Sequence, residues 1–236
     1  MSSDQQTECT EHGRVQSPFR TTDEIGRRPL VLLAILFEGG LGVLACLLGW
    51  WLEIPPWEKI HWRVEDLLWG IAGCVPMLLG FWACLRWPWG PLKRIKEFSE
   101  RIIRPIFRPC TLADLALISL VAGIGEELLF RGVLQTLLCG QLDTWLGIVL
   151  ASLVFGLMHP FSTAYVVLAT GVGIYLGWIF VLTDNLLTVI LIHGLYDFAA
   201  LVYFARTKPS ADLLVPKTNG DTGIDEDKST VNVPPI

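Results

Sequence analysis

An apolar segment near the middle of the chain holds three ionisable side chains, in the stretch Gly123-Ile124-Gly125-Glu126-Glu127-Leu128-Leu129-Phe130-Arg131-Gly132. Ionisable groups at membrane depth are costly, so they persist mainly where they face one another or a wet cavity. On a helix, Glu127 and Arg131 share a face, and an ion pair between them lowers the cost of both charges. Glu126 points about 100° away. We therefore expect a Glu127–Arg131 ion pair and take Glu126 as the candidate general base.

The composition around this segment indicates a polytopic membrane protein. The chain has 236 residues, of which 52% are hydrophobic and only 17% are charged, whereas a soluble domain usually has about 25% charged residues. Apolar runs that approach the roughly 20 residues needed for one helical crossing recur along the chain. We predict an all-α transmembrane bundle of about six spans, at Leu30–Trp51, Leu67–Leu85, Leu112–Leu138, Trp145–Met158, Ala164–Leu182 and Leu186–Phe204.

The chain divides into four parts. Residues 1–28 and 205–236 are polar and charged. We expect the first range to form a flexible tail and the second to form a disordered tail. Residues 29–110 hold two spans and an amphipathic connector. Residues 111–204 hold the last four spans and every residue of the candidate site.

Basic residues cluster on the side of the two tails, so the positive-inside rule predicts that both termini are cytoplasmic. The connector, residues 92–108, interleaves basic and apolar side chains, as helices in the membrane interface do. The net charge of −5 comes largely from acidic residues near the two ends and does not indicate nucleic-acid binding. We expect an integral, multi-pass protein, and the compactness of the chain favours a bacterial inner membrane.

Two histidines and one aspartate place further polar groups in other spans. His159 follows the fourth span, while His193 and Asp197 lie four residues apart on one face of the sixth. A lone intramembrane histidine often only joins two helices through a hydrogen bond. Two of them, together with the glutamate pair, favour one shared site.

The predicted span boundaries leave a geometric difficulty. His159 would lie at the inner end of a short span, up to about 20 Å from Glu126. We therefore expect the third span to start later or to tilt, or the fourth to extend past Pro160. In either case the site should lie in the cytoplasmic half of the membrane.

Three motifs follow one another along the chain: EExxxR (Glu126, Glu127, Arg131), FxxxH (Phe155, His159) and HxxxD (His193, Asp197). In this order they resemble the CPBP family of intramembrane proteases, which includes the type II CAAX prenyl endopeptidases and bacteriocin-immunity-type membrane proteins. The resemblance covers about residues 111–204. It implies helices that enclose a polar cavity, and an endopeptidase that hydrolyses a peptide bond of a membrane-associated or lipid-modified protein or peptide.

The resemblance also implies roles for single residues. Glu126 and His159 would activate water, while His193 and Asp197 would bind the oxyanion or help to hold a metal. The prenyl endopeptidases typically have Asn at the last position, where this chain has Asp197. An ionised Asp cannot donate a hydrogen bond to an oxyanion, so its role requires a proton, a metal or the orientation of a histidine.

A metal is one of two alternatives for this site. Glu126, His159 and His193 offer the His₂Glu ligand set of many catalytic zinc sites, with Asp197 as an outer partner. A metal-free site in which Glu and His activate water is equally compatible with the residues. The chain has no HExxH, GxGD or GxSG motif, which disfavours site-2 zinc, aspartyl and rhomboid chemistry.

Two other classes of function remain as hypotheses. The first is a non-catalytic membrane scaffold or immunity factor that binds a partner protein through the same helices. The second is a proton-coupled transporter, which we rank lower because the chain shows no internal repeat. Glu38, a single carboxylate in the first span, could line the cavity or reach toward a membrane edge.

Overall fold

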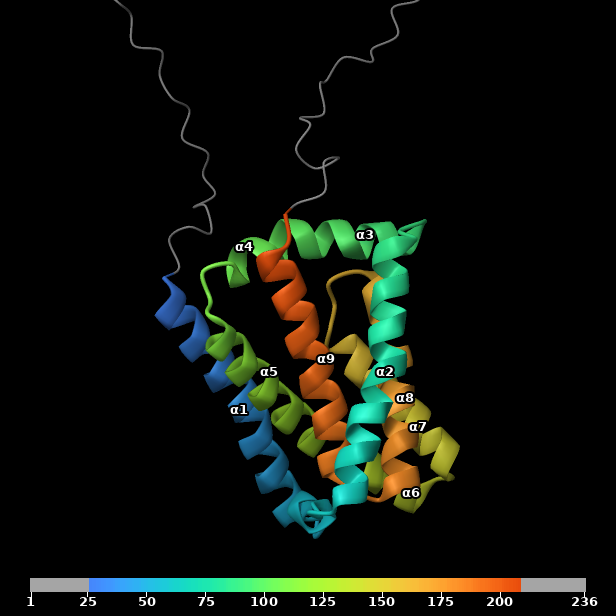
Figure 1. Ribbon diagram of the computed structural model, residues 1–236. Coiled ribbons are helices and arrows are strands. Elements are labelled where there is room, and N and C mark those ends of the chain that lie inside the picture. Colours follow the sequence, from blue (N-terminus) through green and yellow to red (C-terminus); the bar gives the residue numbers. More distant parts are fainter. Residues whose placement is uncertain (1–25, 209–236) are drawn as a thin grey trace, which may run out of the picture.

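Long helices run past one another from one end of the molecule to the other (Figure 1). The structure, a computed structural model, describes residues 26–208, and these form helices but no strand. The longer helices are α1 (Arg27–Trp51), α2 (Val64–Arg86), α5 (Leu112–Glu127), α7 (Thr144–Leu157), α8 (Thr163–Thr183) and α9 (Leu186–Arg206). The shorter segments are η2 (Pro56–Lys59), α3 (Pro91–Phe98), η3 (Ser99–Ile103), α4 (Arg104–Phe107), η4 (Leu128–Gln135) and α6 (Thr136–Gln141).

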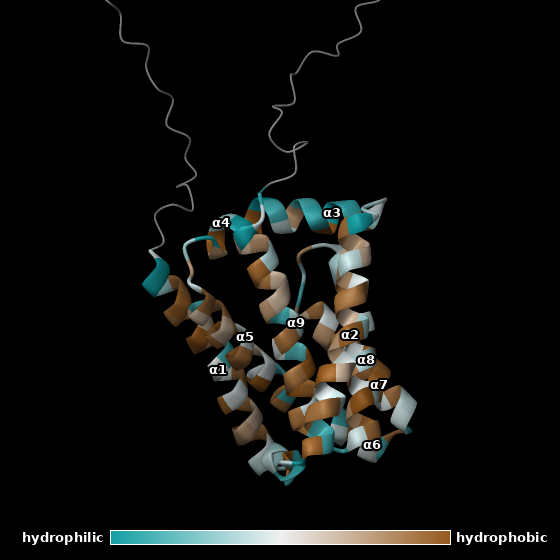
Figure 2. Cartoon of the chain, in the orientation of Figure 1, coloured by the Kyte–Doolittle hydropathy of each residue, from teal (hydrophilic) through white to brown (hydrophobic). Residues whose placement is uncertain are grey.

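The prediction of an all-α membrane bundle is confirmed. Among the described residues, α1, α2, α8 and α9 are each long and apolar enough to cross a membrane. The third predicted span is one continuous helical rod, because the π-helical η4 joins α5 to α6. Helix α7 has 14 residues, which extend about 21 Å and fall short of a hydrocarbon core about 30 Å thick. Hydrophobic residues cover much of the long helices (Figure 2).

The two predicted tails lie largely outside the described residues. The described chain starts at residue 26, and α1 begins at Arg27, just inside the predicted N-terminal tail. Helix α9 ends at Arg206, beyond the predicted end at Phe204. Differences of one or two residues are ordinary at helix ends.

Polar residues determine where the helices around the site begin. Thr111 and Asp114 form a reciprocal capping box at the start of α5, in which each side chain accepts a hydrogen bond from the other's backbone N–H. Asp143, Ser162 and Asn185 accept backbone hydrogen bonds at the starts of α7, α8 and α9. These caps pair N–H groups that have no partner within their own helix.

One end of the bundle is joined by a buried amide. The Asn185 side chain donates to the Asp66 carboxylate at 2.8 Å and to the His61 carbonyl at 2.7 Å, and it accepts from the His61 N–H at 3.0 Å. Lys59 forms an ion pair with Asp184 beside it, at 2.7 Å. The turn between α8 and α9 is therefore attached to the segment that precedes α2.

The connector lies across the opposite end of the bundle, where α9 ends (Figure 1). The Arg104 side chain donates hydrogen bonds to the backbone carbonyl and the hydroxyl of Thr207. Arg206 donates to the Cys110 carbonyl at 2.6 Å. The connector is mostly hydrophilic along α3 (Figure 2), and its side chains Lys93 and Arg94 are exposed.

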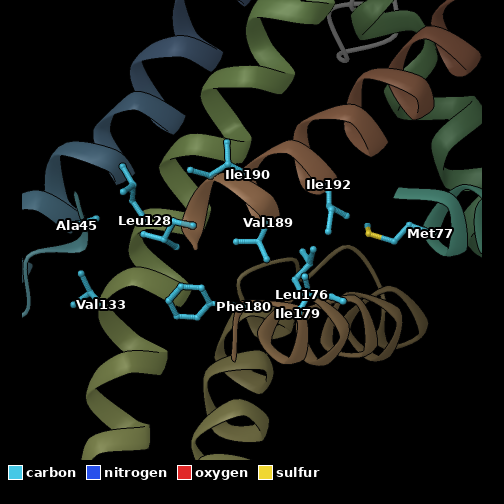
Figure 3. Close-up of a cluster of buried hydrophobic side chains, with 11 residues drawn as sticks. Ala45, Met77, Leu128, Val133, Leu176, Ile179, Phe180, Val189, Ile190 and Ile192 are labelled. Carbon is cyan, nitrogen blue, oxygen red and sulfur yellow. The ribbon is translucent and has the colours of Figure 1, made fainter. Parts of the chain in front are cut away.

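Glycines allow the helices to approach closely near the site. A side chain on Gly125 would collide with the Glu38 carbonyl oxygen of α1, and one on Gly156 would collide with the Thr170 hydroxyl of α8. Buried apolar side chains form a cluster between the helices (Figure 3): Ala45, Met77, Leu128, Val133, Leu176, Ile179, Phe180, Leu186, Val189, Ile190 and Ile192. Small residues therefore set the helix spacing and large ones fill the core.

The α7–α8 crossing provides a test of this packing. Gly156→Ala should lower the free energy of unfolding by about 1–3 kcal/mol, because the added methyl group must displace α8. The matched control is Gly171→Ala on α8, where an added Cβ meets no atom within 4 Å. Thermal unfolding of the purified proteins in detergent measures the difference, and equal melting temperatures for the two variants would contradict the packing.

Candidate active site

The centre of the candidate site is the buried carboxylate of Glu127. Its Oε1 atom accepts a hydrogen bond from Arg131 Nη1 at 2.9 Å and one from His193 Nδ1 at 2.7 Å. The relative exposures are 0% for Glu127, 2% for Arg131 and 5% for His193. The expected Glu127–Arg131 ion pair is therefore present, and the carboxylate also connects α5 to α9.

Arg131 extends this connection to two more helices. Its Nη2 atom donates to the Gly173 carbonyl of α8 at 3.1 Å. Its guanidinium carbon lies 4.6 Å from the ring centroid of Phe155 on α7, within range of a cation–π interaction. A buried charge requires such a set of partners, because an isolated charge in an apolar interior is very costly.

Each of the two histidines is held through its own Nδ1 atom. His159 Nδ1 lies 2.8 Å from the Phe155 carbonyl oxygen, and His193 Nδ1 lies 2.7 Å from Glu127. A carbonyl oxygen only accepts hydrogen bonds, so Nδ1 of His159 carries the proton, and the Arg131-bound carboxylate requires the same of His193. In a neutral ring this arrangement leaves Nε2 with a free lone pair.

Both Nε2 atoms face the carboxylate of Glu126. His159 Nε2 lies 3.9 Å from its Oε1 atom, and His193 Nε2 lies 3.8 Å from its Oε2 atom. Glu126 is 8% exposed, and its Oε2 has no hydrogen-bond partner among the described residues. Adjacent glutamates thus have separate surroundings. Oε1 of Glu127 accepts from Arg131 and His193, whereas Glu126 faces the two Nε2 atoms. The Oε2 atom of each glutamate is buried and has no hydrogen-bond partner among the described residues.

Asp197 completes the group of candidate residues. Its Oδ2 atom lies 3.4 Å from His193 Nε2, and its side chain is 32% exposed, the most open of the cluster. The expectation that His193 and Asp197 share a face of one helix is met. The structure thus brings together Glu126, Glu127, Arg131, His159, His193 and Asp197 from three separate predicted spans.

The gap of up to about 20 Å that the predicted span boundaries imply between His159 and Glu126 does not occur, since His159 Nε2 lies 3.9 Å from Glu126 Oε1. The third span begins at Leu112 as predicted, and α7 ends at Leu157, before Pro160. The short helix α7 stops inside the bundle, and the chain then continues without helix toward the connector (Figure 1). Phe161 in this segment packs against Phe98 of α3, with ring centroids 5.1 Å apart.

Several contributors were not assigned a role from the sequence. The backbone carbonyls of Phe155 and Gly173 hold His159 and Arg131, and a backbone acceptor leaves no signal in residue type. Tyr165 packs beside His159, with ring centroids 6.1 Å apart. Its place follows from the turn between α7 and α8, which spacing within one helix does not predict.

In the described part of the chain, no three His, Cys, Asp or Glu side chains form a group that could hold a metal ion. Zinc binding by Glu126, His159 and His193 stays a prediction.

The fold is a helical membrane bundle, and one family of known proteins is similar to the part of the chain that holds the candidate site. Residues 108–199 match the family model described as type II CAAX prenyl endopeptidase Rce1-like. The match contains all three motifs. Searches of curated proteins and of solved structures found no match.

Residues 108–199 are therefore similar to the Rce1-like type II CAAX prenyl endopeptidases, and the predicted resemblance to the CPBP family is confirmed. The family is one of intramembrane proteases.

The central ion pair can be tested by a double-mutant cycle. Arg131→Met should lower the free energy of unfolding by about 3–5 kcal/mol, because it leaves the Glu127 charge buried without its main partner. Combining Arg131→Met with Glu127→Gln removes that charge and should recover part of the loss. Denaturant unfolding in detergent micelles provides the measurement. If the two substitutions were simply additive, the pair would not act as a unit.

Proposed function

We propose that the protein is an intramembrane endopeptidase in which Glu126 and His159 activate a water molecule. The substrate is a membrane-associated or lipid-modified protein or peptide. The proposal rests on the family match together with one geometric observation: both histidines direct Nε2 toward the Glu126 carboxylate. Contacts of 3.8–3.9 Å are too long for direct hydrogen bonds, and a water molecule that bridges such groups is a common arrangement.

The proposed reaction uses Glu126 as both base and acid. Glu126 takes a proton from water as the water oxygen bonds to the peptide carbonyl carbon. The C–N bond then breaks, and the same proton passes to the departing amine. His159, held at Nδ1, accepts a hydrogen bond from the water at Nε2 and orients its attack.

His193 and Asp197 are proposed to stabilise the oxyanion. Donation from His193 Nε2 requires the imidazolium form, and that form has a carboxylate at each ring nitrogen, Glu127 at Nδ1 and Asp197 at Nε2. Asp197 then orients and balances the charged ring, a role that does not require Asp to donate a hydrogen bond. This explains how Asp can stand where the prenyl endopeptidases typically have Asn.

The surface beside the site supports a substrate with an apolar portion. A hollow of about 400 Å³ lies between α1 and α5, and apolar atoms form almost all of its surface. Gly42 and Gly125 line it, and Gly125 directly precedes Glu126. A hydrophobic group held there would contact the backbone of the helix that carries the proposed base.

Cleavage assays in liposomes test the proposed activity. Glu126→Gln should reduce cleavage of membrane-anchored reporter peptides, prenylated ones included, by about 10²–10⁴-fold, because it removes the general base. The matched control is Glu53→Gln, because Glu53 is exposed and follows the C-terminal end of α1. Equal cleavage by the Glu126→Gln and wild-type proteins would overturn the proposal.

The same assay separates the alternatives. Loss of cleavage with a chelator, restored by zinc, would establish a metal-dependent protease. No effect of the chelator would favour the metal-free site. A cellular phenotype that survives Glu126→Gln and His159→Ala in folded protein would favour the non-catalytic scaffold.

We also propose that both termini face the cytoplasm of a bacterial inner membrane. The connector, with its exposed basic side chains, lies at the end of the bundle where α9 ends, and cytoplasmic loops are enriched in Lys and Arg. Terminal tags should be protected from external protease in spheroplasts, whereas a tag in the segment between α1 and α2 should be cleaved. The reverse pattern would contradict this orientation.

A further inference from the structure

Glu38 is a carboxylate in the middle of α1, a helix that lies outside the family match. Its backbone carbonyl lies directly against Gly125 of α5, the residue before Glu126. Gly42, one turn further along α1, also meets Gly125. The close crossing of α1 and α5 therefore holds Glu38 at the level of the proposed base.

The carboxylate of Glu38 lies within electrostatic range of the candidate site. The side chains whose charges act on it include Glu126, Asp197, His193 and His159. Its Oε2 atom is buried, and no donor among the described residues reaches it. Of the two roles left open by the sequence, lining the cavity is the one that this placement supports.

The site then contains more acidic than basic groups. Glu38, Glu126, Glu127 and Asp197 are opposed by the guanidinium of Arg131 and two imidazoles. Arg131 is already committed to Glu127 and to the Gly173 carbonyl. Three of the carboxylates, Glu38, Glu126 and Glu127, each keep a buried oxygen that no hydrogen-bond donor among the described residues reaches.

We propose that Glu38 binds a basic side chain of the substrate close to the peptide bond that is cleaved. This inference rests on the proposed function, because it concerns the substrate of the same site. A basic side chain would supply the donor that Glu38 Oε2 lacks, and it would balance the acidic excess in a poorly solvated space, where such interactions are strong. An acidic side chain at the same point would be repelled.

The position of Glu38 separates this role from the chemistry. Glu126 faces both histidines, whereas Glu38 belongs to α1, the helix that crosses α5 at Gly125. Glu38 thus discriminates among substrates, while Glu126 performs the proton transfer.

The test uses reporter peptides in liposomes in which Lys, Leu or Glu is placed at each position near the cleaved bond. For wild-type protein, we expect kcat/KM at one position to be at least about tenfold higher for Lys than for Glu. Glu38→Gln should bring this ratio close to one, and Glu38→Lys should reverse it. Glu53→Gln, the same substitution away from the site, should keep the wild-type ratio.

Binding is measured beside cleavage, with the Glu126→Gln protein and photo-crosslinking Lys and Glu peptides. If the protein binds the Lys peptide more tightly than the Glu peptide, and Glu38→Gln abolishes this preference, the inference is supported. Binding with this preference but without cleavage of any peptide would count against the proposed function alone. A Lys-to-Glu ratio that is the same with and without Glu38, in proteins with equal melting temperatures, would overturn the inference and leave the proposed function standing.

Discussion

The buried carboxylate of Glu127 is the interaction on which the arrangement of the site depends. One oxygen accepts hydrogen bonds from Arg131 and His193, and Arg131 in turn reaches the Gly173 carbonyl and the ring of Phe155. Four helices, α5, α7, α8 and α9, therefore meet around a single charge pair. In an apolar surrounding, that pair is tolerable only when polar partners surround its charges, so the charge restricts how these helices can pack.

This constraint also gives the two adjacent glutamates different roles. Glu127 forms the ion pair with Arg131. Glu126 points about 100° away on the same helix, and it faces the two Nε2 atoms. The histidines are directed there by acceptors at Nδ1, one a backbone carbonyl and the other Glu127 itself. The same carboxylate thus supports the helix packing and orients a side chain of the site, which links stability and chemistry in one group.

The helices outside the family match contribute to the site through α1. The glycine contact between α1 and α5 brings Glu38 to the level of Glu126 and forms one wall of the apolar hollow. At the two ends, Asn185 and Arg104 hold the bundle through buried hydrogen bonds. In the proposed function, the chemistry is carried by the later helices, while α1 contributes a wall of the hollow and a charge that would act on the substrate.

The sequence by itself determined the all-α membrane class, the helix limits to within a few residues, the Glu127–Arg131 pair and the grouping of Glu126 with the two histidines. These follow from apolar run length, helical periodicity and the cost of charge in a membrane, which are local properties. Only the tertiary structure decided that α7 ends inside the bundle, that His193 bonds to Glu127, and that Glu38 lies within electrostatic range of the site. Each of these depends on how separate helices approach one another, and that is set by glycine contacts, backbone acceptors and a non-helical segment, none of which leaves a periodic pattern in the sequence.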